Sequence, residues 1–177
     1  MSWFKKLWYY VFTTEHMRTT TTTSTTTRSN GSHLKTAICI GINNYPGTNN
    51  DLRGCINDAK AWAEILESFY GFSPRLMLDA NATVSEVKAA ILNEIAKTQD
   101  GDSLVVTYSG HGSNVKDTNG DEADGRDETW YLYDGNLKDD SIKKVLSTLP
   151  EGVNLTIISD SCHSGTVTRS FLQALET

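Results

Sequence analysis

Two short polar segments carry the side chains whose types and spacing point to chemistry. Cys162 lies in Asp160-Ser-Cys-His-Ser-Gly165, a polar setting that suits the packing of a cysteine poorly. His111 stands between two glycines, roughly 50 residues upstream. A thiol becomes a strong nucleophile only when a base or a lowered pKa produces the thiolate. The pair therefore predicts nucleophilic catalysis by Cys162 with His111 as its base.

Each of the two segments follows an apolar run that is typical of a β-strand. Leu104–Tyr108 precedes the histidine, and an alternating run from Val153 to Ser159 precedes the cysteine. Reacting groups in open α/β sheets sit at the carboxyl ends of the strands. Two parallel neighbours would bring His111 and Cys162 to one rim of the sheet. The alternative is two unrelated surface loops, and the matched setting of the two residues argues against it.

Strands and helices alternate along the rest of the chain. Further strands are expected at Thr36–Ile42 and Arg75–Leu78, with an outlying one at Thr129–Tyr133. The apolar spacing and the capping residues predict four helices: from Asn57 or Asp58 to Tyr70, from the capping pair Thr83 and Glu86 to Ile95, over Asp140–Leu149, and from Ser170. This alternation predicts an α/β fold, a three-layer α/β/α sandwich around a mostly parallel sheet.

Residues 1–34 are predicted to lie outside this fold, as a disordered Thr-rich tail and linker, with residues 35–177 forming the catalytic domain. The aromatic segment Met1–Phe12 is too short in its apolar part to span a membrane and has no signal-cleavage pattern. Two interpretations remain for it: a sticky disordered tail, which we favour, or an anchor at a membrane surface.

Length and composition limit the classes of function. The chain has 177 residues, which suits one domain with a real core, and its net charge of −6 argues against a nucleic-acid partner. Its three cysteines, Cys39, Cys55 and Cys162, form no evident disulfide framework. Free thiols favour a reducing compartment, so the expected location is cytoplasmic.

Three motifs, in order, resemble those of the metacaspases, the caspase-related cysteine peptidases of bacteria, plants, fungi and protists. Tyr108-Ser-Gly-His-Gly112 and Asp160-Ser-Cys-His-Ser-Gly165 resemble the family's His and Cys motifs, and Leu52-Arg-Gly-Cys-Ile-Asn-Asp-Ala59 resembles the segment after its first strand. The animal caspase signature Q-A-C-[RQG]-G is absent. The resemblance covers residues 35–169 and implies a caspase-like fold of the bacterial type, of which this chain has the larger, p20-like subunit.

The resemblance implies a cysteine endopeptidase that cleaves after Arg or Lys. His111 and Cys162 would form the catalytic dyad, and the backbone N–H groups of Gly112 and Cys162 would hold the oxyanion. The neighbouring His163 is assigned a structural or solvent-facing role, because adjacent loop residues usually diverge. A non-catalytic or partner-dependent caspase-like regulatory module that lacks the small subunit is the alternative.

The resemblance also implies a substrate pocket made by Asp58, Ser109 and Asp160. Two carboxylates in one pocket repel each other and raise each other's pKa, and a cationic substrate side chain relieves that repulsion. Taken singly, Asp58 is equally well explained as a helix cap and Asp160 as an acceptor that stabilises a loop. The motif match favours the pocket.

Partners and cofactors follow from the same resemblance. The partners expected are protein or peptide substrates with Arg or Lys. For the strands of the smaller subunit three alternatives stay open: they lie on a separate chain, are supplied by a partner, or are absent from a shortened form. An enzyme of this specificity should also cut its own tail, after Arg28 or Lys35. No cofactor is required for the chemistry.

Calcium is an open alternative in this interpretation. The carboxylates that match a metacaspase calcium site are Asp127, Asp139 and Asp140. The family's further acidic ligand after the cysteine has no counterpart, because Thr168 and Arg169 occupy that region.

Overall fold

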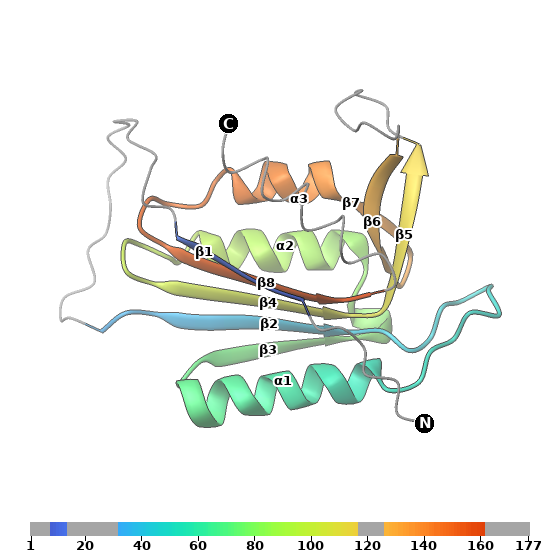
Figure 1. Ribbon diagram of the computed structural model, residues 1–177, viewed down its shortest axis with the longest axis horizontal. Helices are drawn as coiled ribbons and strands as arrows, with labels where there is room; N and C mark the ends of the chain where they lie inside the picture. Colours follow the sequence, from blue (N-terminus) through green and yellow to red (C-terminus); the bar gives the residue numbers. More distant parts are fainter. Residues whose placement is uncertain (1–7, 14–31, 117–125, 162–177) are drawn as a thin grey trace.

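The computed structural model describes residues 8–13, 32–116 and 126–161, which are built around a five-stranded sheet (Figure 1). The strand order is β1-β8-β4-β2-β3. Four strands run parallel, and β1 alone is antiparallel to its neighbour. The bounds are β1 Trp8–Thr13, β2 Lys35–Gly41, β3 Ser73–Leu78, β4 Ser103–Ser109 and β8 Asn154–Asp160. The predicted mostly parallel sheet is confirmed.

Helices cover both faces of this sheet and complete the predicted three layers (Figure 1). Helix α1 (Cys55–Tyr70) lies on one face, and α2 (Val84–Ile95) and α3 (Asp139–Leu146) lie on the other. A short 3-10 helix, η1 (Asp79–Asn81), links β3 to α2. A small antiparallel sheet stands at the carboxyl end of the main one and is made of β5 His111–Lys116, β6 Arg126–Leu132 and β7 Gly135–Lys138.

The alternation of side chains along the strands separates two hydrophobic cores. In β4, Leu104 and Val106 pack towards α2 and α3, whereas Val105 packs towards α1. The same period of two directs Tyr108 to the α2 side and Ser109 to the α1 side. Strand alternation therefore decides which polar groups meet at the carboxyl rim.

Helix α1 begins earlier than the predicted cap at Asn57 or Asp58. Its N-cap is Gly54 in a left-handed conformation, with φ 113°, so no side chain caps it. The close approach of α1 to β2 depends on Gly41, because a Cβ there would clash with the carbonyl oxygen of Cys55. Asp58 consequently lies in the first turn of α1, next to the carboxyl end of the sheet.

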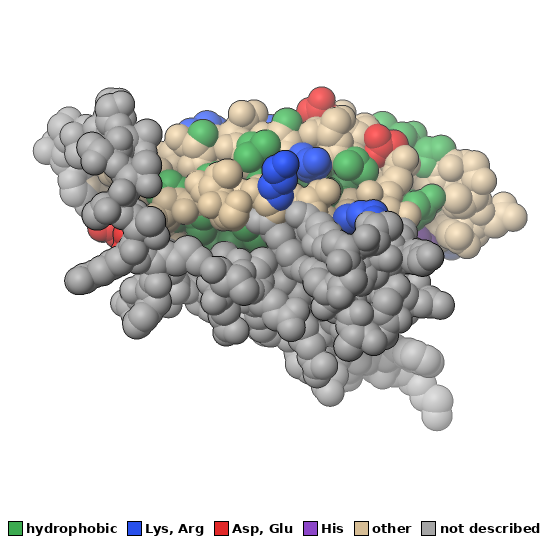
Figure 2. Space-filling model, turned by 90° about the horizontal axis from the view of Figure 1, so that it is seen from above, with side chains coloured by type: hydrophobic (Ala, Val, Ile, Leu, Met, Phe, Trp, Pro, Cys, Tyr) green, Lys and Arg blue, Asp and Glu red, His purple; other side chains and the backbone are tan. Residues whose placement is uncertain are grey.

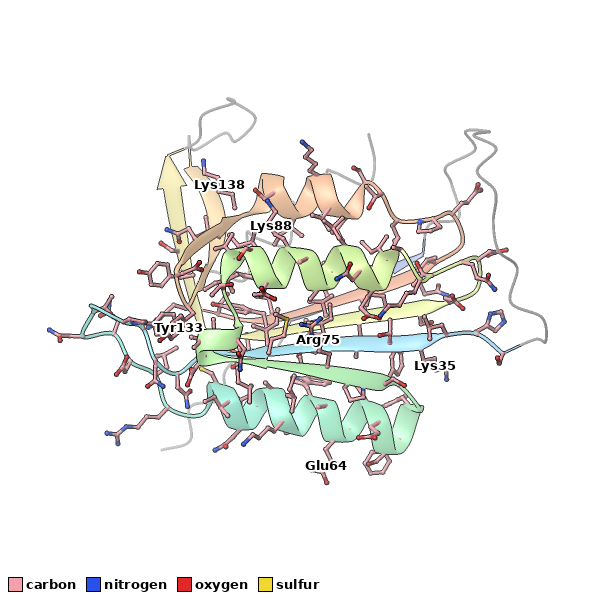
Figure 3. All side chains as sticks on the ribbon, turned by 180° about the vertical axis from the view of Figure 1, so that it is seen from behind. Lys35, Glu64, Arg75, Lys88, Tyr133 and Lys138 are labelled. Atoms are coloured by element: carbon pink, nitrogen blue, oxygen red, sulfur yellow. The ribbon has the colours of Figure 1, made fainter. Side chains whose placement is uncertain are left out.

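The other predicted helix signals agree with the structure. Helix α1 ends at Gly71, which is left-handed with φ 70°. Its outer side is solvated, and Glu64 points away from the sheet (Figure 3). Helix α2 is capped by Thr83, whose Oγ1 accepts a hydrogen bond of 3.3 Å from the backbone N–H of Glu86. The helix predicted from Ser170 lies outside the described residues.

The N-terminal segment differs from the predicted tail. Residues 1–34 were expected outside the fold, whereas Trp8–Thr13 forms the edge strand β1 and pairs with the whole of β8, from Trp8 opposite Ser159 to Thr13 opposite Asn154. Aromatic and β-branched residues favour strands, and this segment is rich in both. Neither the disordered tail nor the surface anchor expected for Met1–Phe12 included this strand.

A second difference concerns His111, which was expected on a loop. It is the first residue of β5, which pairs antiparallel with β6. The predicted outlying strand is found as β6 but ends at Leu132, and β5 had no apolar run to indicate it. His111 therefore lies at the junction of two strands, because β4 ends only two residues before it.

Surface features add little to the expectations about partners. On the face seen from the α3 side, Lys and Arg side chains are interspersed with hydrophobic and polar ones (Figure 2). Across the described segments, no helix is both long and apolar enough to cross a bilayer. Cys39 and Cys55 are both buried.

Candidate active site

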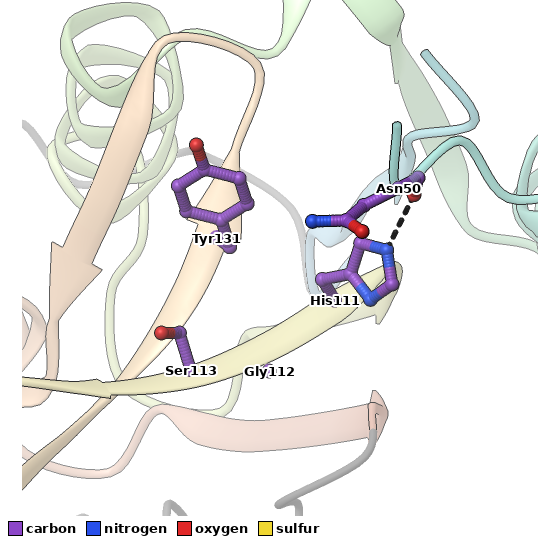
Figure 4. Close-up of a pocket in the computed structure, with 5 residues that line it drawn as sticks. All are labelled: Asn50, His111, Gly112, Ser113 and Tyr131. Atoms are coloured by element: carbon purple, nitrogen blue, oxygen red, sulfur yellow. Dashed lines mark hydrogen bonds between the residues drawn. The ribbon is translucent and has the colours of Figure 1, made fainter. Parts of the chain in front are cut away.

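The imidazole of His111 is held by the segment that joins β2 to α1. Its Nε2 lies 2.6 Å from the backbone carbonyl oxygen of Asn50 (Figure 4). A carbonyl can only accept, so Nε2 must carry the hydrogen and donate it. Nδ1 is therefore the nitrogen left to act as a base, as the chemistry predicted for this residue requires.

Next to this histidine is a cavity of about 260 Å³, lined by Asn50, His111, Gly112, Ser113 and Tyr131. The ring of Tyr45 lies against the imidazole, with 4.7 Å between the ring centroids. Tyr45 in turn stacks on Tyr131 at 5.5 Å. The predicted base thus has one aromatic wall and one open side. Gly112 lines the open side, where its predicted oxyanion role stays a prediction.

A second cavity of about 170 Å³ contains all three residues of the predicted substrate pocket. It is lined by Asp58, Ala61, Trp62, Ile65, Ser109 and Asp160. Ser109 Oγ donates a hydrogen bond of 3.0 Å to Asp58 Oδ2. Ser109 and Asp160 are direct partners in the β4·β8 register. Asp58 reaches them because α1 begins close to the end of β2.

The chemistry of this second cavity is acidic at one part and apolar at another. Asp58 and Asp160 contribute carboxylates, whereas Trp62 and Ile65 contribute hydrophobic surface from the next turns of α1. A long side chain with an apolar stem and a cationic end matches such a lining.

The end of β8 is joined to the segment of His111. The backbone N–H of Gly110 donates a hydrogen bond of 3.3 Å to the carbonyl oxygen of Asp160. Cys162, the predicted nucleophile, and His163 lie outside the described residues, which end at Ser161. The last described residue of this segment directly precedes Cys162, so the chain leads to the cysteine from the rim that holds His111.

The three predicted calcium ligands come from one end of the β6·β7 ladder. Thr129 pairs with Lys138, so Asp127 lies two positions beyond that pair on β6, and Asp139 and Asp140 directly follow it at the start of α3. Carboxylate oxygens are the ligands that Ca²⁺ prefers. A calcium site at this end of the ladder stays a prediction. The three side chains lie outside the described ones, and among the side chains described no cluster of acidic, His or Cys residues could hold a metal.

Two features of the site were missed by sequence reasoning. Asn50 acts through its backbone oxygen, so its residue type carries no signal of that role. Trp62 packs against the core from α1, and it also borders the cavity, a role that its apolar character alone does not indicate.

Comparison with known proteins shows the family to which the chain belongs. Residues 35–170 match the family model described as "Metacaspase, peptidase C14 domain". Among curated relatives, the chain is 38% identical over 145 residues to Metacaspase-1 of Schizosaccharomyces pombe, 43% over 153 residues to Metacaspase-1A of Neurospora crassa and 39% over 141 residues to Metacaspase-4 of Arabidopsis thaliana. These alignments cover 74%, 78% and 74% of the chain and 34% of each relative.

A solved structure shows the same fold. Protein GSU0716 from Geobacter sulfurreducens superposes with a TM-score of 0.67 at 37% identity, over 78% of this chain and 55% of that one. The chain spans about a third of the length of the curated relatives it matches. Because the family model covers most of the chain, the motifs, the fold and the comparisons agree that it belongs to the metacaspases of the peptidase C14 group.

Proposed function

We propose that this chain is a cysteine endopeptidase that cleaves after Arg or Lys with a His111–Cys162 dyad. One arrangement carries the proposal: the cavity with Asp58, Ser109 and Asp160 opens at the same strand ends as His111. His111 follows Ser109 by two residues, and Gly110 between them is hydrogen-bonded to Asp160. A bound basic side chain would thus place the adjoining peptide bond near the imidazole.

The proposed reaction is acyl transfer through a thioester. Nδ1 of His111 takes the proton from Cys162 Sγ, and the thiolate forms a bond to the scissile carbonyl carbon. The same nitrogen then gives the proton to the leaving amine as the C–N bond breaks. Water, deprotonated by His111, hydrolyses the thioester and releases the thiol. The Asn50 carbonyl stabilises the imidazolium formed at both stages, since it already accepts from Nε2.

The proposed specificity rests on charge and shape together. A guanidinium or ammonium group would lie between the carboxylates of Asp58 and Asp160, while its alkyl stem would contact Trp62. An acidic side chain would instead add a third negative charge to a cavity that has two. The pocket therefore discriminates by repulsion as well as by attraction.

Cleavage of a matched peptide series tests the proposal. The peptides differ only at the residue before the cut, which is Arg, Lys, Gln or Asp, and Cys162→Ala serves as the inactive control. Cleavage of the Arg and Lys peptides alone is expected, and it should disappear in the Cys162→Ala protein. Full activity of that variant, or preferred cleavage after Asp, would show the assignment to be wrong. The non-catalytic form of the regulatory-module alternative predicts no cleavage of any peptide, with or without a chain that supplies the smaller subunit, whereas the partner-dependent form predicts cleavage only when that chain is added.

Self-processing is also part of the proposal, and the pairing of Lys35 argues against one of its two candidate cleavage sites. Lys35 is the first residue of β2, pairs with Ser103 and donates from Nζ to the carbonyl oxygen of Tyr70 at 3.1 Å. It also lies at the opposite end of the sheet from Tyr133, which follows β6 near the candidate site (Figure 3). Cleavage after Lys35 would need β2 to open, so Arg28, outside the described residues, is the better candidate.

One experiment tests self-processing and its dependence on calcium together. Purified protein is incubated with and without Ca²⁺, and the new amino termini are sequenced; the expected terminus is Ser29. An intact tail in an enzyme that cleaves Arg peptides would contradict self-processing. Cleavage that needs no Ca²⁺ and is unchanged by Asp139→Ala would remove the ion from the proposal.

A further inference from the structure

We propose that Tyr45 and Tyr108 are positioning residues that hold the backbone of His111 between their hydroxyl groups, an inference that rests on the proposed function. The N–H of His111 donates a hydrogen bond of 2.8 Å to the hydroxyl oxygen of Tyr45. The hydroxyl of Tyr108 donates one of 2.7 Å to the carbonyl oxygen of His111. Both backbone polar groups of the predicted base are thus held by phenol hydroxyls, which we call the tyrosine clamp.

The clamp is buried, and both of its hydroxyl groups have hydrogen-bond partners. Tyr45 is 2% exposed and Tyr108 1%. The Tyr108 hydroxyl also lies 3.0 Å from the carbonyl oxygen of Tyr131. Burial raises the pKa of Tyr45, so its phenol stays protonated and neutral while it accepts from His111. Buried hydrogen bonds of this kind hold their partners in one geometry.

Gly110 makes room for the clamp. A Cβ at this position would lie 2.8 Å from the hydroxyl oxygen of Tyr45 and 2.8 Å from Cζ of Tyr108. Real side-chain carbons do not approach that closely, so any other residue would displace one phenol. The glycine before the histidine is therefore explained by the two hydroxyls.

The same loop controls the backbone and the ring of His111. Tyr45 and Asn50 both belong to the segment between β2 and α1, which is held in shape by the hydrogen bond of 2.9 Å from the Tyr45 N–H to Asp51 Oδ1. The Tyr45 hydroxyl fixes the backbone, and the Asn50 carbonyl fixes Nε2. A movement of Tyr45 would therefore also displace the hydrogen bond from Nε2 to Asn50, and a movement of Asn50 would displace the one from the backbone N–H to Tyr45.

The clamp also continues towards the end of β8. The ring of Tyr108 stacks on Trp130 at 4.7 Å, and Trp130 Nε1 donates a hydrogen bond of 3.1 Å to Ser159 Oγ. Ser159 Oγ is 3.3 Å from Ser161 Oγ, next to Cys162 in the chain. One buried group of side chains thus contacts the segments that carry both members of the proposed dyad.

The expected consequence is a loss of turnover without a loss of substrate binding. The clamp does not line the cavity that contains Asp58 and Asp160, so KM should change little. A displaced imidazole transfers its proton less well, so kcat should fall. A purely structural role would lower the thermal stability and leave the kcat of the folded fraction unchanged.

The test compares Tyr45→Phe and Tyr108→Phe, each of which removes a single oxygen and keeps the ring. Tyr70→Phe is the matched control, because Tyr70 is 59% exposed at the far end of α1. Each clamp variant should lower kcat about 10- to 100-fold, and the control should leave it unchanged. Wild-type kcat in both variants, or a rise in KM with kcat unchanged, would overturn the proposal.

A second measurement separates this inference from the proposed function. Nitrogen NMR of ¹⁵N-histidine-labelled protein reports which imidazole nitrogen of His111 is protonated, whether or not the protein cleaves peptides. The wild type should be the Nε2–H tautomer, and each clamp variant a mixture, with faster hydrogen exchange at the His111 amide. An unchanged tautomer and amide would overturn the clamp. No cleavage by a wild type that shows these signals would count against the proposed function alone.

Discussion

The two ends of the main sheet treat their carboxylates differently. At the amino end, Asp102 is fully buried, and its two oxygens accept from the backbone N–H groups of Leu34 at 2.6 Å and Gln99 at 2.9 Å. At the carboxyl end, Asp58 accepts from Ser109, while no described residue donates to the carboxylate of Asp160. Both carboxyl-end groups border a cavity.

Under the proposed function, this difference separates carboxylates that support the fold from carboxylates that bind the substrate. A buried carboxylate that accepts from two backbone donors holds together the two segments that supply those donors. It has few lone pairs left to bind a ligand. Carboxylates beside a cavity with few partners keep lone pairs that a cation can use. The role of an aspartate is therefore indicated by the end of the sheet at which it lies, and not by its residue type.

The two described histidines show the same contrast. His33 lies at the amino end, exposed, with its ring against Gly101. His111 lies at the carboxyl end, hydrogen-bonded through its ring and through both backbone groups. Only the second is held in one orientation, which a base needs and a surface residue does not.

The largest effect is expected from exchanging the two histidines for alanine. His111→Ala should lower peptide cleavage by about 10²- to 10⁴-fold, the usual contribution of a general base, while the protein stays folded. His33→Ala should leave cleavage unchanged. Steady-state kinetics with an Arg peptide and circular dichroism measure both. Equal losses in the two variants would mean that the ends of the sheet do not differ in this way.

The next largest effect is expected for Asp160→Ala. It should raise KM and lower kcat/KM for Arg peptides by the equivalent of about 2–5 kcal/mol, because a desolvated cation loses its partner. The thermal midpoint should hardly change, since Asp160 borders a cavity. Loss of stability with unchanged kcat/KM would give Asp160 the role assigned here to Asp102.

Asp102→Ala should have the opposite signature. It leaves two buried N–H donors unsatisfied, so the free energy of unfolding should fall by about 1–3 kcal/mol in urea titrations. Asp102→Asn keeps one acceptor oxygen, so the free energy of unfolding should fall by less in this variant. Activity per folded molecule should stay at the wild-type value, and a drop in kcat/KM for the folded fraction would contradict the comparison.

The smallest effect concerns Glu94, also on the amino half. Burial raises the pKa of its carboxyl. The hydrogen bonds from Lys97 and Thr36 and the charges of Lys97 and Arg75 lower this pKa by a larger amount, so the net shift is downward. A folded pKa below the unfolded one stabilises the protein above the unfolded pKa, and the stabilisation disappears as pH falls through the folded pKa.

Glu94→Gln should therefore cost about 1 kcal/mol at neutral pH, and the difference from the wild type should shrink in acid. Urea titrations across that pH range measure it. A difference that grows as pH falls would reverse the assigned sign. Cleavage at neutral pH should be unaffected in either case.

The sequence predicted the parts of this protein that depend on regular patterns. Alternating apolar residues and glycine-flanked strand ends predicted the positions of β4 and β8, and the cap at Thr83 predicted α2. Because parallel strands end at one rim, the meeting of the carboxyl ends of β4 and β8 was expected from the same patterns, and the structure pairs Ser109 with Asp160 there. That Asp58 shares a pocket with Ser109 and Asp160 was implied only by the family resemblance.

What was missed depends on contacts that have no local pattern. Edge strand β1 is formed by pairing with β8, whose sequence is more than a hundred residues away. The Asn50 carbonyl holds His111 through a group that every residue has. The tyrosine clamp likewise needs three chain segments at once, so spacing along any one of them does not reveal it.

Selective labelling of the proposed thiolate tests the central claim most directly. A thiol-alkylating electrophile that carries an arginine side chain is compared with one that carries aspartate, and the modified residue is located by mass spectrometry. The account predicts that the arginine reagent modifies Cys162 alone, because Cys39 and Cys55 are buried, and that Asp160→Ala and His111→Ala slow the reaction. Equal modification of Cys162 by both reagents, or modification only at the other cysteines, would contradict it.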